Sequence, residues 1–104
     1  MKENIVYMLL CSNQNYYTGW TNDFIRRMTA HQKGTAAHYT RAFTPKKVVY
    51  IERFETKSDA MKKEAQIKKM SRTQKEKMIG AHEAFTSAYL KEHPFQFEQE
   101  KRTL

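Results

Sequence analysis

The sequence predicts an α+β fold, in which a small three-stranded sheet, mixed or antiparallel, is flanked by helices in the order β-β-α-β-α-α. Two strand-like runs joined by a short turn predict a hairpin, and helix-start signals recur before and after a third apolar run. At 104 residues the chain forms one domain at most, and its 39% hydrophobic content suffices for a packed core.

The hairpin comes first. Residues 4–12 (NIVYMLLCS) are rich in branched and apolar side chains, and residues 16–21 (YYTGWT) form the second strand-like run. The polar residues 12–15 (SNQN) between them fit a tight antiparallel connection. Gly19 inside the second strand indicates either a bulge or the close approach of a ligand.

The first helix follows the hairpin directly. Residues 21–23 (TND) are N-cap candidates for a helix that runs to about Gln32, and Gly34 is its stop signal. Residues 33–45 lack hydrophobic periodicity and predict a long loop. Loops of this length in small domains are often functional.

The second half of the chain is predicted to be mainly helical. Residues 47–54 (KVVYIERF) form the third strand, and Ser58 caps a helix from Asp59 to about Met70. Residues 71–74 (SRTQ) have the pattern of a capping box and begin another helix that ends near Gly80. The segment 81–104 begins helix-like and frays into polar sequence. We therefore expect one domain over residues 1–80 and a helical appendage or tail over residues 81–104.

The chain is strongly basic. Nineteen Lys and Arg residues against eleven Asp and Glu residues give a net charge of +8. This excess favours a polyanionic partner, and nucleic acid is expected ahead of acidic lipid. A basic protein without such a partner is the alternative, because net charge alone does not identify a ligand.

Cys11 is the single cysteine, so the chain has no internal disulfide and no multi-cysteine metal site. Its apolar neighbours predict a buried, unreactive thiol. The N-terminal apolar run is too short for a signal peptide, and no segment approaches the ~20 apolar residues of a membrane span. We expect a cytoplasmic protein without a membrane partner.

Glu64 is an unusual carboxylate. At 100° per residue it lies on the same helical stripe as Ala60 and Ile67, which should face the core. A carboxylate in that position needs a cation, a metal or a cleft. The alternative is an ordinary helix salt bridge to Lys68, four residues later.

Arg27 and His31 are four residues apart and lie at the edge of the apolar stripe of the first helix. A guanidinium beside an imidazole is a poor structural pair but a reasonable phosphate clamp, because arginine offers paired donors and histidine can move a proton. A surface arginine beside a half-buried histidine is the competing interpretation.

Tyr7 and Tyr17 stand on the two paired strands, where aromatic residues usually pack against each other. Four residues of the long loop could donate hydrogen bonds to a phosphate backbone, or could be ordinary surface. These loop residues are His38, Tyr39, Thr40 and Arg41.

Taken together, these residues resemble the GIY-YIG nuclease superfamily, and most closely its small single-domain bacterial members, which are similar to the nuclease module of junction-specific endonucleases. The two signature strands correspond to residues 5–7 and 17–19, the arginine and its i+4 histidine to Arg27 and His31, and the metal-binding glutamate to Glu64. The match covers about residues 4–80. Each tripeptide alone is weak, whereas the combined pattern is specific.

The sequence departs from the family pattern at three points. Ile5 replaces the first signature glycine and Thr18 replaces an isoleucine, and neither is a reacting group. Many members also carry an asparagine on a helix after the glutamate, whereas position 76 here is Glu and residues 65–104 contain no asparagine.

The resemblance implies a metal-dependent endonuclease that hydrolyses phosphodiester bonds with Mg²⁺, or Mn²⁺, held by Glu64. In that interpretation Tyr7 deprotonates or orients the attacking water and Tyr17 holds the scissile phosphate. Arg27 stabilises the charge that develops, and His31 relays a proton. Because a free tyrosine has a pKa near 10, Tyr7 can act as a base only if Arg27 or the metal lowers that pKa.

The resemblance also implies substrate contacts from Gly19 and from the loop residues 38–41. DNA is expected ahead of RNA, with structure-selective or weakly selective binding, and a protein partner could supply targeting. Two other functions stay open on the sequence: a non-catalytic nucleic-acid-binding module with the same basic face, and a domain whose basic helix docks an acidic protein.

Overall fold

The computed structural model describes residues 3–102 and contains three strands and six helices in that range. The elements are β1 (Asn4–Cys11), β2 (Tyr16–Thr21), α1 (Phe24–Lys33), α2 (His38–Ala42), β3 (Pro45–Phe54), α3 (Lys57–Lys68), α4 (Arg72–Ala81), α5 (Glu83–Glu92) and α6 (Glu98–Arg102). Both strand pairings are antiparallel, in the order β2-β1-β3. The predicted α+β fold with its β-β-α-β-α-α order is confirmed.

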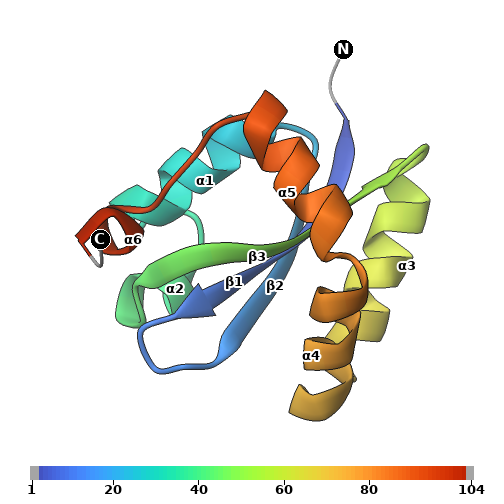
Figure 1. Cartoon of the computed structure of the whole chain (residues 1–104), viewed down its shortest axis with the longest axis horizontal. Coiled ribbons are helices and arrows are strands. Elements are labelled where there is room, and N and C mark those ends of the chain that lie inside the picture. Colours follow the sequence, from blue (N-terminus) through green and yellow to red (C-terminus); the bar gives the residue numbers. More distant parts are fainter. Residues whose placement is uncertain (1–2, 103–104) are drawn as a thin grey trace.

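The sheet has an apolar core on each face, and the helices divide between them (Figure 1). Alternate residues of β1 point to opposite faces because the side-chain period of a strand is two. Tyr7 and Leu9 join the first core with Phe24 and Met28 of α1. The second core packs α3 against the sheet, through Val6, Met8, Tyr50, Ala60 and Ile67.

The start and stop of α1 follow the predicted signals. Asp23 is the N-cap, and its side chain accepts a hydrogen bond from the Arg26 backbone N–H. Gly34 ends the helix with φ of 78°, in the left-handed region that favours glycine. The capping box at the start of α4 is also confirmed, because Ser71 and Gln74 bond each other's backbone N–H groups.

Three local predictions need correction. The segment 33–45 is not a continuous loop, since it contains α2, a short helix without apolar periodicity or a side-chain cap, and β3 begins at Pro45. Thr56, not Ser58, caps α3: its hydroxyl accepts from the Asp59 N–H.

The third correction concerns the C-terminal segment. The helix that begins it is present as α5, but the sequence after α5 does not fray as expected. Phe97 is fully buried in the first core with Tyr89. The Thr86 hydroxyl accepts a hydrogen bond from the Ile51 N–H at the edge of β3, with an N–O distance of 3.1 Å. Residues 83–102 therefore cover the β3 side of the sheet.

Two smaller points concern the cysteine and the helix lengths. Cys11 is buried, as expected, and burial raises the pKa of its thiol to about 11, so the thiolate is disfavoured. None of the helices within residues 3–102 combines the length and the apolar character that crossing a membrane requires.

Candidate active site

The site is built on the β1–β2 pairing. Tyr7 pairs with Gly19 and Leu9 pairs with Tyr17, so both tyrosines lie on the face of the first core. A Cβ atom at Gly19 would lie 2.6 Å from the Tyr7 Oη and 3.2 Å from Tyr17 Cε2. This pairing has no register shift, so Gly19 marks a close approach by the Tyr7 ring and not a bulge. Any residue larger than glycine at position 19 would displace the Tyr7 ring.

His31 meets Tyr7 from α1. The Tyr7 Oη and the His31 Nε2 are 2.6 Å apart, and both residues are only 1% exposed. On its other side His31 Nδ1 lies 2.8 Å from the Thr40 Oγ1, which in turn lies 3.3 Å from the Ala37 carbonyl oxygen. The carbonyl can only accept. All three bonds are therefore satisfied when Thr40 donates to Ala37, His31 Nδ1 donates to Thr40, and Tyr7 donates to His31 Nε2.

Both ends of the Tyr7–His31 bond are uncharged at neutral pH. Burial, with the charge of Arg27 as a smaller cause, lowers the pKa of His31 to about 4. Burial likewise raises the pKa of Tyr7 well above its usual value, and the lowering by Arg27 does not offset it. Of the two groups expected to lower the pKa of Tyr7, Arg27 or a metal, Arg27 alone does not offset the effect of burial.

Charged groups of both signs act on the two tyrosines. Burial is the largest cause of the raised pKa of Tyr17; Glu64 raises this pKa further and Arg27 lowers it. The same two charges act on Tyr7 with the same signs. Tyr7, Tyr17 and His31 are in direct ring contact. Arg27 and Glu64, from two helices on opposite faces of the sheet, act on both tyrosines through their charges.

Glu64 also has the ordinary partner that the sequence suggested. Its Oε2 lies 3.5 Å from the Lys68 Nζ, one helical turn along α3. The Glu64 side chain is 20% exposed and that of Lys68 is 54% exposed. Exposed ion pairs of this kind contribute only about 0.3–0.5 kcal/mol. The pair therefore explains little of why a carboxylate stands beside Ala60 and Ile67.

The loop residues 38–41 occupy distinct positions. Tyr39 stacks on Tyr17, with ring centroids 6.0 Å apart, and its Oη accepts a hydrogen bond from the Asn13 amide. His38 and Arg41 are exposed and lie within hydrogen-bond distance of each other. Thr40 is 2% exposed and lies behind His31, so its hydroxyl orients the imidazole and is not available to a phosphate.

Sequence reasoning missed the connection of Thr40 to His31 and that of Asn13 to Tyr39. Neither follows from spacing, because Thr40 lies nine residues after His31 in a segment without periodicity. The one signal in the sequence is the residue type, because a threonine hydroxyl can accept the second ring N–H of a histidine that uses its other nitrogen elsewhere.

The donor set fits a weakly held divalent cation. Within residues 3–102 no three His, Cys, Asp or Glu side chains gather to form an all-protein cage. Mg²⁺ keeps several waters and often binds through one or two carboxylates plus substrate oxygens. Glu64 is partly exposed, and its charge raises the pKa of both tyrosines, so it is a suitable single carboxylate for such a shared site.

A three-stranded antiparallel sheet with paired tyrosines, an arginine and histidine on the first helix and a glutamate on the third defines a GIY-YIG-type domain. The model of the family described as the GIY-YIG catalytic domain matches residues 3–77. The chain belongs to this family, which is of the nuclease type.

Two of its relatives are small proteins that match this chain over nearly their whole length. A UPF0213 protein from Clostridium perfringens, CPE1444, is 44% identical over 89 residues, covering 86% of this chain and 96% of that protein. The UPF0213 protein VNG_2274C from Halobacterium salinarum is 47% identical over 74 residues, covering 71% and 96%. Solution structures of EF2693 from E. faecalis and BH0048 from Bacillus halodurans match with TM-scores of 0.56 and 0.52, at 39% and 37% identity. The matches cover 78% and 76% of this chain, and 86% and 84% of the EF2693 and BH0048 chains, respectively.

Proposed function

We propose that this protein is a metal-dependent endonuclease that hydrolyses phosphodiester bonds in DNA, with structure-selective or weakly selective binding. The buried Tyr7–His31 hydrogen bond carries the proposal. A tyrosine that served only for packing would not need these neighbours. They are a glycine against its hydroxyl, a neutral histidine that accepts its proton in a hydrogen bond, and the opposite charges of Arg27 and Glu64. The net charge of +8 supports a polyanionic substrate.

In the proposed mechanism Tyr7 passes a proton on and is not ionised beforehand. An attacking water gives its proton to the Tyr7 Oη while the hydroxyl proton of Tyr7 moves to His31 Nε2, across the 2.6 Å bond. His31 Nδ1 keeps its bond to Thr40, which holds the ring in place. This route avoids a free tyrosinate, which burial makes unfavourable.

The remaining residues bind and orient the substrate. Arg27 is exposed on the same face of α1 as His31 and offers paired donors to the phosphate, and Tyr17 contacts a phosphate oxygen. Glu64 is the residue that would hold Mg²⁺ or Mn²⁺. When bound, such a cation supplies positive charge for the leaving oxygen.

The test is a cleavage assay on a panel of labelled DNA and RNA structures, including single strands, duplexes, flaps and junctions. We expect cleavage with Mg²⁺ or Mn²⁺ and none with EDTA. Glu64→Gln should abolish cleavage, whereas Glu55→Gln, an exposed carboxylate away from the site, should leave the rate unchanged.

Lys68→Ala separates the two roles of Glu64. If Glu64 serves the helix salt bridge alone, Lys68→Ala should reproduce the effect of Glu64→Gln, because either change removes the pair. Equal loss in the two variants, or full activity of Glu64→Gln, would overturn the metal-site assignment. Salt-sensitive DNA binding without cleavage under any metal would instead support the non-catalytic binding module.

A further inference from the structure

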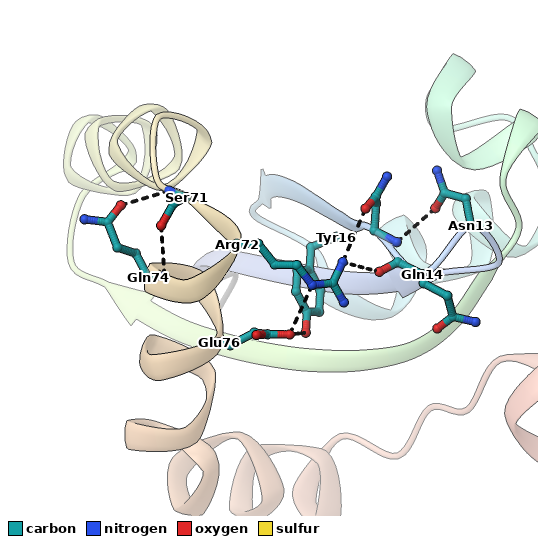
Figure 2. Close-up of polar contacts among 8 residues, drawn as sticks. Asn13, Gln14, Tyr16, Ser71, Arg72, Gln74 and Glu76 are labelled. Atoms are coloured by element: carbon teal, nitrogen blue, oxygen red, sulfur yellow. Dashed lines mark hydrogen bonds and ion pairs between the residues drawn. The ribbon is translucent and has the colours of Figure 1, made fainter.

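A second polar site lies where the start of α4 meets the turn between β1 and β2 (Figure 2). The surface here has a pocket of about 260 Å³. Two aromatic residues and two cationic residues line it, together with one asparagine: Tyr16, Tyr39, Arg72, Lys75 and Asn15. None of the residues assigned to catalysis above lines this pocket.

Arg72 is held rigidly in the pocket wall. Its Nη1 donates to the Gln14 carbonyl oxygen at 2.6 Å and to the Asn15 Oδ1 at 3.3 Å, and its Nε donates to the Glu76 Oε2 at 3.2 Å. The guanidinium carbon lies 5.0 Å from the centre of the Tyr16 ring. A fixed, planar guanidinium backed by an aromatic ring is a surface on which a nucleobase can stack.

Glu76 completes this wall and offsets the charge of Arg72. The Tyr16 Oη donates to the Glu76 Oε2 at 3.1 Å, and burial together with this bond raises the pKa of Tyr16, so the donor stays protonated. Glu76 thus joins α4 to the hairpin. It leaves the wall close to neutral.

Lys75 has no such partner. Across residues 3–102, no carboxylate forms an ion pair with its ammonium group and no acceptor bonds it, whereas Lys68 and Lys101 each pair with a glutamate. Its side chain is half-buried at the pocket, although a surface lysine could extend freely into water. The pocket therefore presents one uncompensated cation beside a planar stacking surface.

The pocket adjoins the catalytic residues. Tyr39 lines it and stacks on Tyr17, whose ring centroid is 5.2 Å from that of His31. Both sites also lie along β2, which is an edge strand of the sheet. A DNA strand bound at the catalytic residues would therefore have its neighbouring nucleotide at this pocket.

We propose that the pocket binds one unpaired nucleotide of a DNA strand next to the scissile phosphate, with the base stacked on Arg72 and the phosphate bound by Lys75. The assignment rests on the proposed nuclease function for its position relative to the cut. It deepens that function, because it selects substrates in which a base beside the scissile bond is free of a complementary strand, as in flaps, bulges and single strands.

The test measures binding in EDTA, so that no cleavage is needed. The probes are a labelled dT 12-mer and an abasic 12-mer of the same charge, titrated by fluorescence anisotropy at several salt concentrations. Lys75→Ala should weaken the binding of both probes about fivefold at 0.1 M salt and reduce the salt slope by about 0.7. Arg72→Lys keeps the positive charge but removes the planar guanidinium group. It should weaken binding of the dT probe by about fivefold or more and leave binding of the abasic probe nearly unchanged.

Lys77→Ala is the matched control. Lys77 lies on the same helix but about 200° around it from Lys75, and it is exposed. We expect unchanged affinity and salt slope. Equal effects of Lys75→Ala and Lys77→Ala, or equal affinity of the wild-type protein for the two probes, would overturn the pocket assignment. Lys75 lies outside the Arg72 hydrogen-bond network, so this comparison holds even if Arg72→Lys fails to fold.

The two proposals fail separately. Pocket-dependent binding with no cleavage of any substrate would overturn the nuclease function and support the pocket. Normal cleavage with no effect of Lys75→Ala on binding would overturn the pocket and support the nuclease. Faster cleavage of a duplex carrying one unpaired nucleotide than of the matched perfect duplex would support both.

Discussion

Tyr7 and Tyr50 lie on neighbouring strands but on opposite faces of the sheet, and they are almost equally buried, at 1% and 2% exposure. Tyr7 belongs to the row Gly19–Tyr7–Ile51, and Tyr50 to the adjacent row Thr18–Met8–Tyr50. Burial raises the pKa of both well above the usual value for tyrosine. By burial and pKa alone the two residues are equivalent.

Their neighbours separate them. The Tyr7 hydroxyl donates to a neutral imidazole, and its Oη packs so closely on Gly19 that a Cβ atom there would lie 2.6 Å away. The Tyr50 hydroxyl donates to Glu52, two residues along the same strand, and the residue in the corresponding β2 position is Thr18. The Tyr50 contact is therefore local to its own strand and involves none of the residues of the candidate site. A perturbed pKa alone therefore does not single out a reactive tyrosine, and the other residues around its hydroxyl must be considered as well.

Removing each hydroxyl in turn tests whether the two tyrosines differ in function. Tyr7→Phe should lower the cleavage rate by about 10²–10⁴-fold, the usual contribution of a positioned proton-transfer group. Tyr50→Phe should leave the rate within about twofold. Both should cost similar stability, about 1 kcal/mol, because each removes one buried hydrogen bond. Cleavage rates and urea unfolding of the two variants measure both effects; equal loss of activity would contradict the assignment of Tyr7.

The close contact between Tyr7 and Gly19 can be disturbed without changing any reacting group. Gly19→Ala places a Cβ atom 2.6 Å from the Tyr7 Oη, so the ring must move. We expect about a hundredfold lower cleavage rate, since a displacement of about 1 Å can have that effect. Gly80→Ala is the control, because a Cβ there meets no atom within 4 Å and alanine favours the helix by about 0.5–1 kcal/mol. A fully active Gly19→Ala protein would show that the position of Tyr7 is not limiting.

The histidine on Tyr7 gives the first core a pH dependence. The pKa of His31 is about 4 in the folded protein and about 6.5 in the unfolded chain, so below pH 6.5 the unfolded chain binds more protons. Stability attributable to His31 is therefore complete above pH 6.5 and declines towards pH 4, by at most about 1.4 kcal/mol per pH unit.

Urea unfolding between pH 7.5 and 4 measures this decline. His31→Gln should remove most of it, whereas His38→Gln, on an exposed histidine, should retain it. The same decline in both variants would mean that other groups determine the acid sensitivity.

The smallest effect is expected on the face of Tyr50. The Thr18 hydroxyl is buried and has no hydrogen-bond partner in residues 3–102. Thr18→Val removes the unpaired group at nearly constant shape and should stabilise the protein by about 1 kcal/mol with no change in cleavage. Thermal or urea unfolding would measure this gain; a loss of stability would indicate that the hydroxyl does have a partner.

The sequence predicted the structural features that depend on short stretches of neighbouring residues. The hairpin, the Asp23 and Gly34 helix boundaries and the capping box at Ser71 all follow from short-range rules, and the structure has them. The pairing of Tyr7 with Gly19 does not follow from such rules, because strand register depends on the whole sheet.

Other features depend on tertiary contact alone. Thr40 acquires its role through a hydrogen bond to His31 across a segment without periodicity, and Phe97 is buried in spite of its polar neighbours. Sequence patterns place such residues on a loop or a tail, because no sequence window contains their partners. The pocket at Arg72 and Lys75 joins residues about 60 positions apart for the same reason.

The two ends of the described chain meet on one core. Phe97 packs in the core with β1, the Tyr89 hydroxyl donates to Glu3, and the Glu98 N–H donates to the Gln32 side chain. On a translating ribosome, which adds about 5–20 residues per second, that face of the sheet must stay open for seconds after the hairpin emerges. The nascent chain would then expose Leu9 and Phe24 until the C-terminal segment is added, and the face that carries Tyr7, Tyr17 and His31 would close last.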